Sequence, residues 1–226
     1  MEIFKFIEGN TRLLSENISD KRVLVLGSGP SAREVDWESY EWDVLITTSF
    51  FYLNSSVISK KPIHITLSDI VDLTDIRLLD YLDSNPKCTI AFEPKAHPFY
   101  ESDNFKNFVS KYKSRIILYN IVSQFSGKEG VAGRVCWLAL SCEPSHLIIC
   151  GVDGISKNRE TDPQNYFRTH HGTADSYPYE DYKNSFEKFG TNLYRLGIQL
   201  NVIVKNLGIG KPYNMISNIS KMFEND

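Results

Sequence analysis

The segment from Arg22 to Ser31 constrains the fold more than any other part of the chain. An unbroken apolar run, Val23–Leu26, ends in the sequence Gly27-Ser28-Gly29-Pro30-Ser31. Apolar runs without alternation are typical of strands buried on both faces of a parallel sheet. The two glycines allow a tight turn with main-chain N–H groups close to a ligand, and Pro30 and Ser31 suit the first turn of a following helix.

The N-terminus of such a helix attracts anions, so this turn predicts a nucleotide or phosphate site. The alternative is a plain strand-to-helix turn with nothing bound. The turn is neither the full dinucleotide fingerprint, Gly-x-Gly-x-x-Gly, nor a Walker loop, which requires Gly-Lys-Ser/Thr.

Composition narrows the class of protein. With 226 residues, 42% of them hydrophobic, the chain is expected to form one domain over residues 1–226 with a substantial core. A net charge of −3 argues against binding to duplex nucleic acid, which attracts positively charged proteins.

The four cysteines lack paired metal-ligand spacing and predict buried free thiols in a reducing compartment. Without a leader or an apolar stretch of about 18–20 residues, we expect a cytoplasmic protein with no membrane span.

Apolar runs alternate with segments of helical periodicity along the whole chain. The runs predict strands at 22–26, 43–47, 62–67, 88–92, 115–119, 146–150 and 200–204. Helices are expected at 2–18 (within a leading segment 1–20), 32–40, 72–82, 105–112, 130–142, 180–196 and 213–223 (within a C-terminal segment 213–226). This alternation indicates an α/β fold, a Rossmann-like, doubly wound and mostly parallel sheet.

Ligands of doubly wound sheets bind outside the carboxyl ends of the strands, near a topological switch point. This rule gathers the residues that follow the predicted strands at one edge, namely 27–31, 47–50, 68–69 and 151–153. Asp69 and Asp153 either contact a ribose there or cap a turn. The polar segment 156–179 opens on the same edge and is long enough to be a functional loop. His64, inside an apolar strand, is expected to be a core histidine.

Two glycine-bearing motifs resemble those of the bacterial lipo-oligosaccharide sialyltransferases. The first is Gly27-Ser28-Gly29-Pro30-Ser31 with Asp36 following, and then the strand that leads into Phe50-Phe51-Tyr52. The second is Ala132-Gly133 with the later strand that ends in Gly151-Val152-Asp153. A related set, the motility-accessory-factor-like proteins and the 6-hydroxymethylpterin diphosphokinases, shares the Rossmann-like core.

The resemblance implies a glycosyltransferase that uses a CMP-sugar or another nucleotide-activated sugar, without a metal or a further cofactor. Its other implied partners are a glycan or similar small acceptor and further copies of the chain in a homo-oligomer. The expected nucleotide-contacting residues, including the two aspartates introduced above, are Gly27, Ser28, Gly29, Pro30, Ser31, Thr48, Ser49, Asp69, Ala132, Gly133 and Asp153.

The family's general base is a histidine before the penultimate helix. Strict spacing places Ser176 at that position, and His170 and His171 lie slightly upstream, so either histidine is a candidate base. Tyr166 and Arg168 are candidates for stabilising the departing donor phosphate, or they are ordinary residues of a surface loop.

Two alternatives stay open on the sequence. The same core supports pyrophosphoryl transfer from ATP, with Mg²⁺ held by carboxylates such as Asp69 and Asp153. The second alternative is a non-catalytic nucleotide-binding module. It stays open because Thr48 and Val131-Ala132 differ from the residues that contact the donor in the family.

Overall fold

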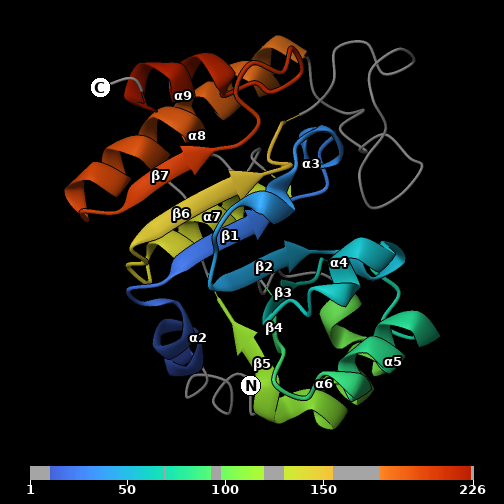
Figure 1. The fold of residues 1–226 in the computed structure, drawn as a ribbon. Coiled ribbons are helices and arrows are strands. Elements are labelled where there is room, and N and C mark those ends of the chain that lie inside the picture. The colour runs from blue at the N-terminus through green and yellow to red at the C-terminus, as the bar shows by residue number, and fades with distance from the viewer. Residues whose placement is uncertain (1–10, 69, 93–97, 120–129, 155–178, 225–226) are drawn as a thin grey trace.

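Seven parallel strands form one sheet in the computed structural model, which describes residues 11–68, 70–92, 98–119, 130–154 and 179–224 (Figure 1). Their order across the sheet is β5-β4-β3-β2-β1-β6-β7, and every pair of neighbours runs parallel. The strands are β1 Arg22–Leu26, β2 Val44–Thr48, β3 His64–Thr66, β4 Thr89–Phe92, β5 Ile116–Leu118, β6 His146–Cys150 and β7 Ile203–Asn206. The predicted Rossmann-like α/β fold is confirmed.

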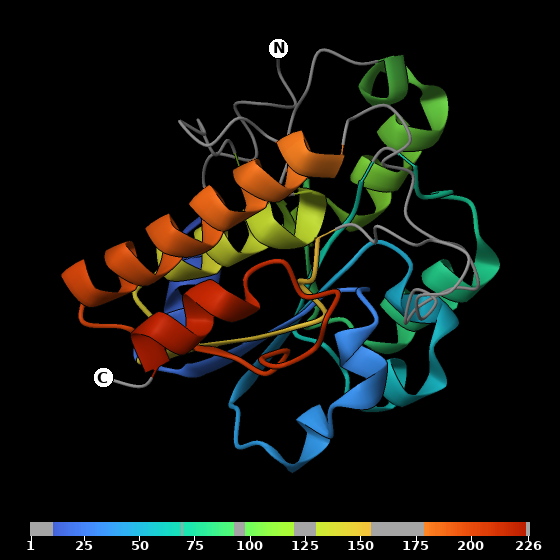
Figure 2. The ribbon, with the colours of Figure 1, turned by 90° about the horizontal axis from the view of Figure 1, so that it is seen from above.

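Helices cover both faces of this sheet. The α-helices are α2 Thr11–Ile18, α3 Ser31–Glu34, α4 Ser55–Ser59, α5 Ile76–Ser84, α6 Asp103–Tyr112, α7 Gly130–Leu140, α8 Tyr179–Gln199 and α9 Ser217–Glu224. Within the described residues, the connections between strands and helices also contain the 3₁₀ turns η2 Trp37–Ser39, η3 Phe51–Leu53, η4 Pro98–Glu101 and η5 Lys113–Arg115. Figure 2 shows α7 and α8 side by side on one side of the sheet, with α3 on the other.

The sheet separates two apolar cores, because successive side chains of each strand point to opposite faces. In β1, Leu24 and Leu26 enter the core beneath α4, α5 and α6. Val23 and Val25 enter the opposite core, with α2, α7 and α8. A strand buried on both faces has no polar positions, which explains the unbroken apolar run in the sequence.

Three of the helices begin at side-chain caps. Asn54 accepts hydrogen bonds from the amides of Ser56 and Val57 at α4, at 3.0 and 3.3 Å. Asp75 caps α5 through the Arg77 amide, and Ser102 caps α6 through the Phe105 amide. Such caps satisfy amides that have no partner within the helix.

Some boundaries differ from those predicted. The helix expected over 32–40 is broken into the single turn α3 and the 3₁₀ turn η2, because Val35 takes an extended conformation and Trp37 is buried. The last strand begins three residues later than expected, and α4 was not predicted. The leading helix is described only from Thr11 onwards. Across the part of the chain with a described structure, no helix is long and apolar enough to cross a membrane.

Candidate functional site

The sheet has its topological switch point between β1 and β6. Strand order runs from β1 outward to β5 on one side, and the chain then returns to place β6 and β7 on the other side of β1. The connections that follow these two strands leave on opposite faces of the sheet, which is the arrangement that defines a switch point. The turn after β1, residues 27–31, therefore lies at the position expected for a ligand (Figure 1).

The main-chain amides of this turn donate hydrogen bonds within the protein. The amide of Gly27 donates to the Cys150 carbonyl and that of Gly29 to the Gly151 carbonyl, both at 2.8 Å. The Ser31 amide donates to Oδ2 of Asp153 at 2.7 Å. For Gly27, Gly29 and Ser31 the expectation of bare amides is therefore not met, because these three amides have acceptors within the protein, and the acceptor at Ser31 is a carboxylate.

Gly27 and Gly151 allow two turns of the backbone to touch. A Cβ atom at Gly27 would lie 2.3 Å from the carbonyl oxygen of Gly151. In the reverse direction, a Cβ at Gly151 would lie 2.3 Å from the oxygen of Gly27, and Gly151 also has a φ of +69°. The glycines that marked a ligand site in the sequence thus have a structural role, the close approach of the β1 and β6 turns.

Ser31 fixes the same junction from the other side. Its side chain is fully buried, and its Oγ accepts a hydrogen bond from the Gly151 amide at 2.9 Å. Pro30 has helical dihedral angles, φ −62° and ψ −24°, immediately before the short helix α3. Both residues begin the helix as predicted, but α3 ends after one turn.

Asp153 caps the turn. Only 3% of the residue is exposed, and Oδ1 accepts a hydrogen bond from Nδ2 of Asn214 at 2.7 Å. Burial raises the pKa of this carboxyl group, while its hydrogen bonds to Ser31 and Asn214 act in the opposite direction. Of the two roles considered for Asp153, ribose contact or turn cap, the observed hydrogen bonds match the cap.

The end of β2 contributes hydroxyl groups to the same edge. Thr48 is buried, whereas Ser49 is half-buried and has a φ of +46°. The Ser49 amide donates to the Thr66 carbonyl at 2.8 Å, and its Oγ lies 3.1 Å from Oγ of Ser68. Because β2 is the neighbour of β1, these hydroxyl groups lie next to the switch point.

The N-terminal turn of α7 approaches from the face opposite α3. A Cβ at Gly27 would lie 3.1 Å from Cβ of Ala132, so the first turn of α7 contacts the turn after β1. Gly133 is buried and Ala132 half-buried. The structure therefore brings together the predicted residues of the β1 turn, the end of β2, the start of α7 and Asp153.

The remaining predicted residues lie outside the described parts of the chain. These are Asp69, the candidate bases His170 and His171, and the candidate phosphate ligands Tyr166 and Arg168.

Sequence reasoning missed the residues that follow β7. Asn214 reaches Asp153, and Nζ of Lys211 lies 2.8 Å from Oε2 of Glu34 in α3. Burial strongly raises the pKa of Tyr213, and Glu34 adds to this effect. The segment Gly208–Pro212 follows the last strand and carries two glycines, so the strand-end rule would have placed it at the same edge.

A surface depression of about 360 Å³ lies beside α3 and η2 and is lined by Ala32, Arg33, Glu34, Val35, Asp36, Trp37 and Glu38. None of the predicted nucleotide-contacting residues belongs to this lining.

The sheet order and the junction at its switch point define a Rossmann-like α/β protein with its candidate site at the carboxyl edge of the sheet. Among solved structures, the chain is similar to the sialyltransferase CstII from Campylobacter jejuni in complex with a substrate analogue, cytidine-5'-monophosphate. That match has a TM-score of 0.56 and 15% sequence identity, and it covers 88% of this chain and 84% of the other. The resemblance found in the sequence is thereby confirmed at the level of the fold.

A second similar structure is the MAf glycosyltransferase from Magnetospirillum magneticum AMB-1, with a TM-score of 0.41 and 11% identity. The match covers 96% of this chain and 41% of the other chain. No protein-family model matches the sequence, and a search of curated proteins finds no match.

Proposed function

We propose that the chain is a metal-independent glycosyltransferase that uses a nucleotide-activated sugar of the CMP type. The observation that carries this proposal is the shared fold: most of the chain matches a sialyltransferase solved with a cytidine nucleotide. Those expected nucleotide-contacting residues that the structure describes also gather at the switch point of the sheet, where doubly wound folds bind their ligands.

Burial divides the proposed nucleotide-contacting residues into two groups. Gly27, Ser31, Thr48, Gly133 and Asp153 are buried and shape the site from beneath. The half-exposed residues present surface to a ligand, so we assign direct contact with the nucleotide to Ser28, Gly29, Pro30, Ser49 and Ala132.

We assign the chemistry to the segment that follows β6. A neutral imidazole of His170 or His171 takes the proton from the acceptor hydroxyl while the glycosidic bond forms, which typically accelerates such reactions by about 10²–10⁴. Arg168 and Tyr166 donate hydrogen bonds to the phosphate as the bond from the sugar to the nucleotide breaks. The acceptor in this proposal is a glycan.

The pyrophosphokinase alternative is less well supported by the geometry of Asp153. Both oxygens of its carboxylate accept hydrogen bonds, from the Ser31 amide and from Asn214. The residue is also only 3% exposed, so this carboxylate offers little surface to a Mg²⁺ ion.

A thermal-shift screen with CMP, UDP, GDP and ATP, each with and without Mg²⁺, tests the proposal. We expect CMP to raise the melting temperature equally in both conditions, because a ligand that binds only the folded state stabilises it. Stabilisation only by ATP with Mg²⁺ would favour the kinase. No response to any nucleotide would contradict both enzymatic functions.

Alanine variants of His170 and His171 then test the assigned base. We expect one variant to lower turnover by about 10²-fold or more while the affinity for CMP is unchanged. Full activity of both variants would exclude a histidine base at these positions.

A further inference from the structure

Asp153 joins the turn after β1 to the C-terminal stretch, defined here as residues 206–224. Its Oδ2 accepts from the Ser31 amide at 2.7 Å, and its Oδ1 accepts from Nδ2 of Asn214 at 2.7 Å. Its carbonyl oxygen accepts from the Met215 amide at 2.9 Å. One residue at the end of β6 therefore holds two segments that are far apart in the sequence.

The contact with Asn214 continues into a buried polar network. Nδ2 of Asn206 donates to Oδ1 of Asn214 at 3.2 Å and to Oγ of Ser220 at 2.8 Å. All four residues, Asp153 included, are at most 5% exposed. Buried networks with satisfied donors and acceptors select one arrangement of the segments that they connect, since any shift leaves a buried polar group without a partner.

Glycines allow the C-terminal stretch to pack closely against the turns after β1 and β6. A Cβ at Gly29 would lie 2.4 Å from Oδ2 of Asp153, and a Cβ at Gly208 would lie 2.2 Å from Nδ2 of Asn214. Gly154 has a φ of +93°, and a Cβ atom there would lie 2.4 Å from Sδ of Met215. The C-terminal stretch is thus packed in direct contact with the switch-point turns.

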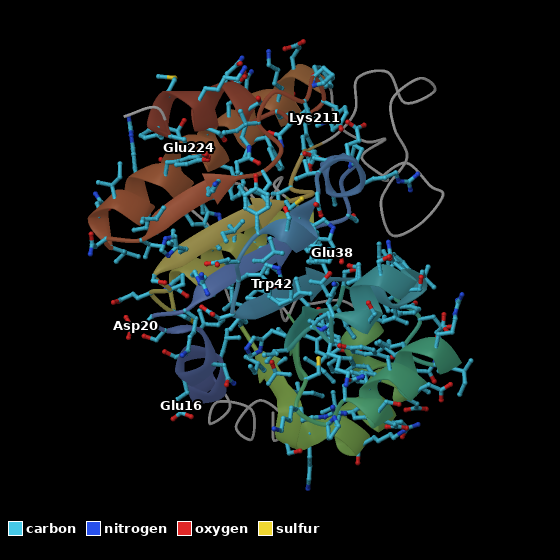
Figure 3. The ribbon with its side chains drawn as sticks, viewed as in Figure 1. Glu16, Asp20, Glu38, Trp42, Lys211 and Glu224 are labelled. Carbon is cyan, nitrogen blue, oxygen red and sulfur yellow. The ribbon has the colours of Figure 1, made fainter. Side chains whose placement is uncertain are left out.

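A surface ion pair adds a second connection between the same two segments. Nζ of Lys211 lies 2.8 Å from Oε2 of Glu34 in α3, and Figure 3 shows Lys211 close to that helix. Glu34 lies only three residues after Ser31, so both connections act on the segment that follows β1.

We propose that Asp153 is a positioning residue through which the docked C-terminal stretch holds the turn after β1 in the shape that the nucleotide requires. This inference rests on the proposed function for the nucleotide, but the coupling between the two segments can be measured without any ligand. In this inference Asp153 acts on nucleotide binding indirectly, through the turn after β1. The segment after β7 then helps to hold that turn in place.

Asp153 accepts and Asn214 donates in the hydrogen bond between them, so exchanging the two residues singly and together gives a matched set of variants. In Asp153→Asn, the new amide can accept from Ser31, but its NH₂ group then faces the NH₂ group of Asn214. In Asn214→Asp, two carboxylates face each other. In the double variant, the amide at position 153 donates to the carboxylate at position 214, which also accepts from Asn206, so every donor again has an acceptor.

The test measures two properties of each variant: the affinity for CMP by calorimetry, and the hydrogen exchange, without ligand, of the amides of residues 27–29, 31 and 32. For both single variants we expect exchange in the turn to rise by about tenfold and CMP affinity to fall by about tenfold or more, well below the melting temperature. The double variant should restore both properties to within about threefold of wild type, because it restores the hydrogen-bond pattern.

Leu78→Ala, in the core beneath α5, is the control for a general loss of stability. It should lower the melting temperature without changing exchange in the turn or CMP affinity. Unchanged exchange in the turn of Asn214→Asp, or a double variant no better than the single ones, would overturn the inference. If wild type binds no nucleotide, the proposed function fails, whereas the exchange measurements still decide whether the C-terminal stretch positions the turn.

Discussion

At the scale of single residues, Gly29 is, like Gly27, a position where the turn after β1 leaves no room for a side chain. A Cβ would lie 2.4 Å from Oδ2 of Asp153 and 2.8 Å from the oxygen of Gly151. Both atoms are held by hydrogen bonds, so neither can move freely. We expect Gly29→Ala to destabilise the protein by about 1–3 kcal/mol through overpacking, measured by urea denaturation. A loss below about 0.5 kcal/mol would show that the turn moves aside, contrary to this description.

His64 makes the stability of the folded protein depend on pH. It is 2% exposed, as expected for a core histidine, and burial lowers its pKa to about 4 from 6.5. Between these values the unfolded chain binds a proton that the folded chain does not. Stability is therefore fully present above pH 6.5 and falls towards pH 4, by about 3 kcal/mol from this group.

The check is to compare urea denaturation of wild type and His64→Gln from pH 7 to pH 4.5. The variant does not titrate at this position, so its stability should fall less steeply with decreasing pH. Parallel curves would show that His64 does not contribute to the acid sensitivity.

At the scale of elements, β7 lies at one edge of the sheet, and α9 covers part of that edge. The amides of Ile203 and Leu207 donate to the segment of β6, so the Asn206 amide points away from it. That amide donates to Oε1 of Glu224 at 2.8 Å, and the same oxygen accepts from the Tyr194 hydroxyl at 2.5 Å. Figure 3 shows Glu224 on α9 above the strand.

Glu224→Ala removes the acceptor for both donors. We expect a loss of about 1–3 kcal/mol in the free energy of unfolding, because two polar groups lose a charged partner. Asn218→Ala, on the exposed side of the same helix, is the control and should change stability by less than about 0.5 kcal/mol. Equal stability of both variants in urea denaturation would show that Glu224 does not clamp the edge.

The elements themselves were largely predictable from the sequence. The strands β1, β2 and β6 each contain a run of three or four apolar residues because both of their faces are buried, and such runs are visible without knowledge of the neighbouring strands. The helix expected over 32–40 failed for a tertiary reason: Trp37 turns into the core, which breaks the helix after one turn.

For the candidate site, the position of its turn in the fold was predictable from the sequence, whereas the contacts of that turn were not. The strand-end rule placed the turn after β1 correctly, because it depends only on the parallel sheet. The hydrogen-bond partners of that turn, Cys150, Gly151 and Asp153, lie more than a hundred residues away in the chain. A glycine required by another backbone and a glycine required by a ligand look the same in a sequence.

At the scale of the whole molecule, five segments distant in sequence meet at one edge of the sheet. They are the turn after β1, the end of β2, the start of α7, the end of β6 and the stretch after β7. An edge built from so many segments depends on the packing of the whole domain, and buried hydrogen bonds around Asp153 connect three of its segments. We propose that this edge binds the nucleotide of an activated sugar.

A crystal structure of the protein with CMP tests that claim most directly. We predict the nucleotide at the carboxyl ends of β1 and β2, in contact with Ser28, Ser49 and Ala132, with the Asp153–Ser31 hydrogen bond intact. CMP bound elsewhere, for example in the depression lined by residues 32–38, or an empty switch point at saturating CMP, would contradict it.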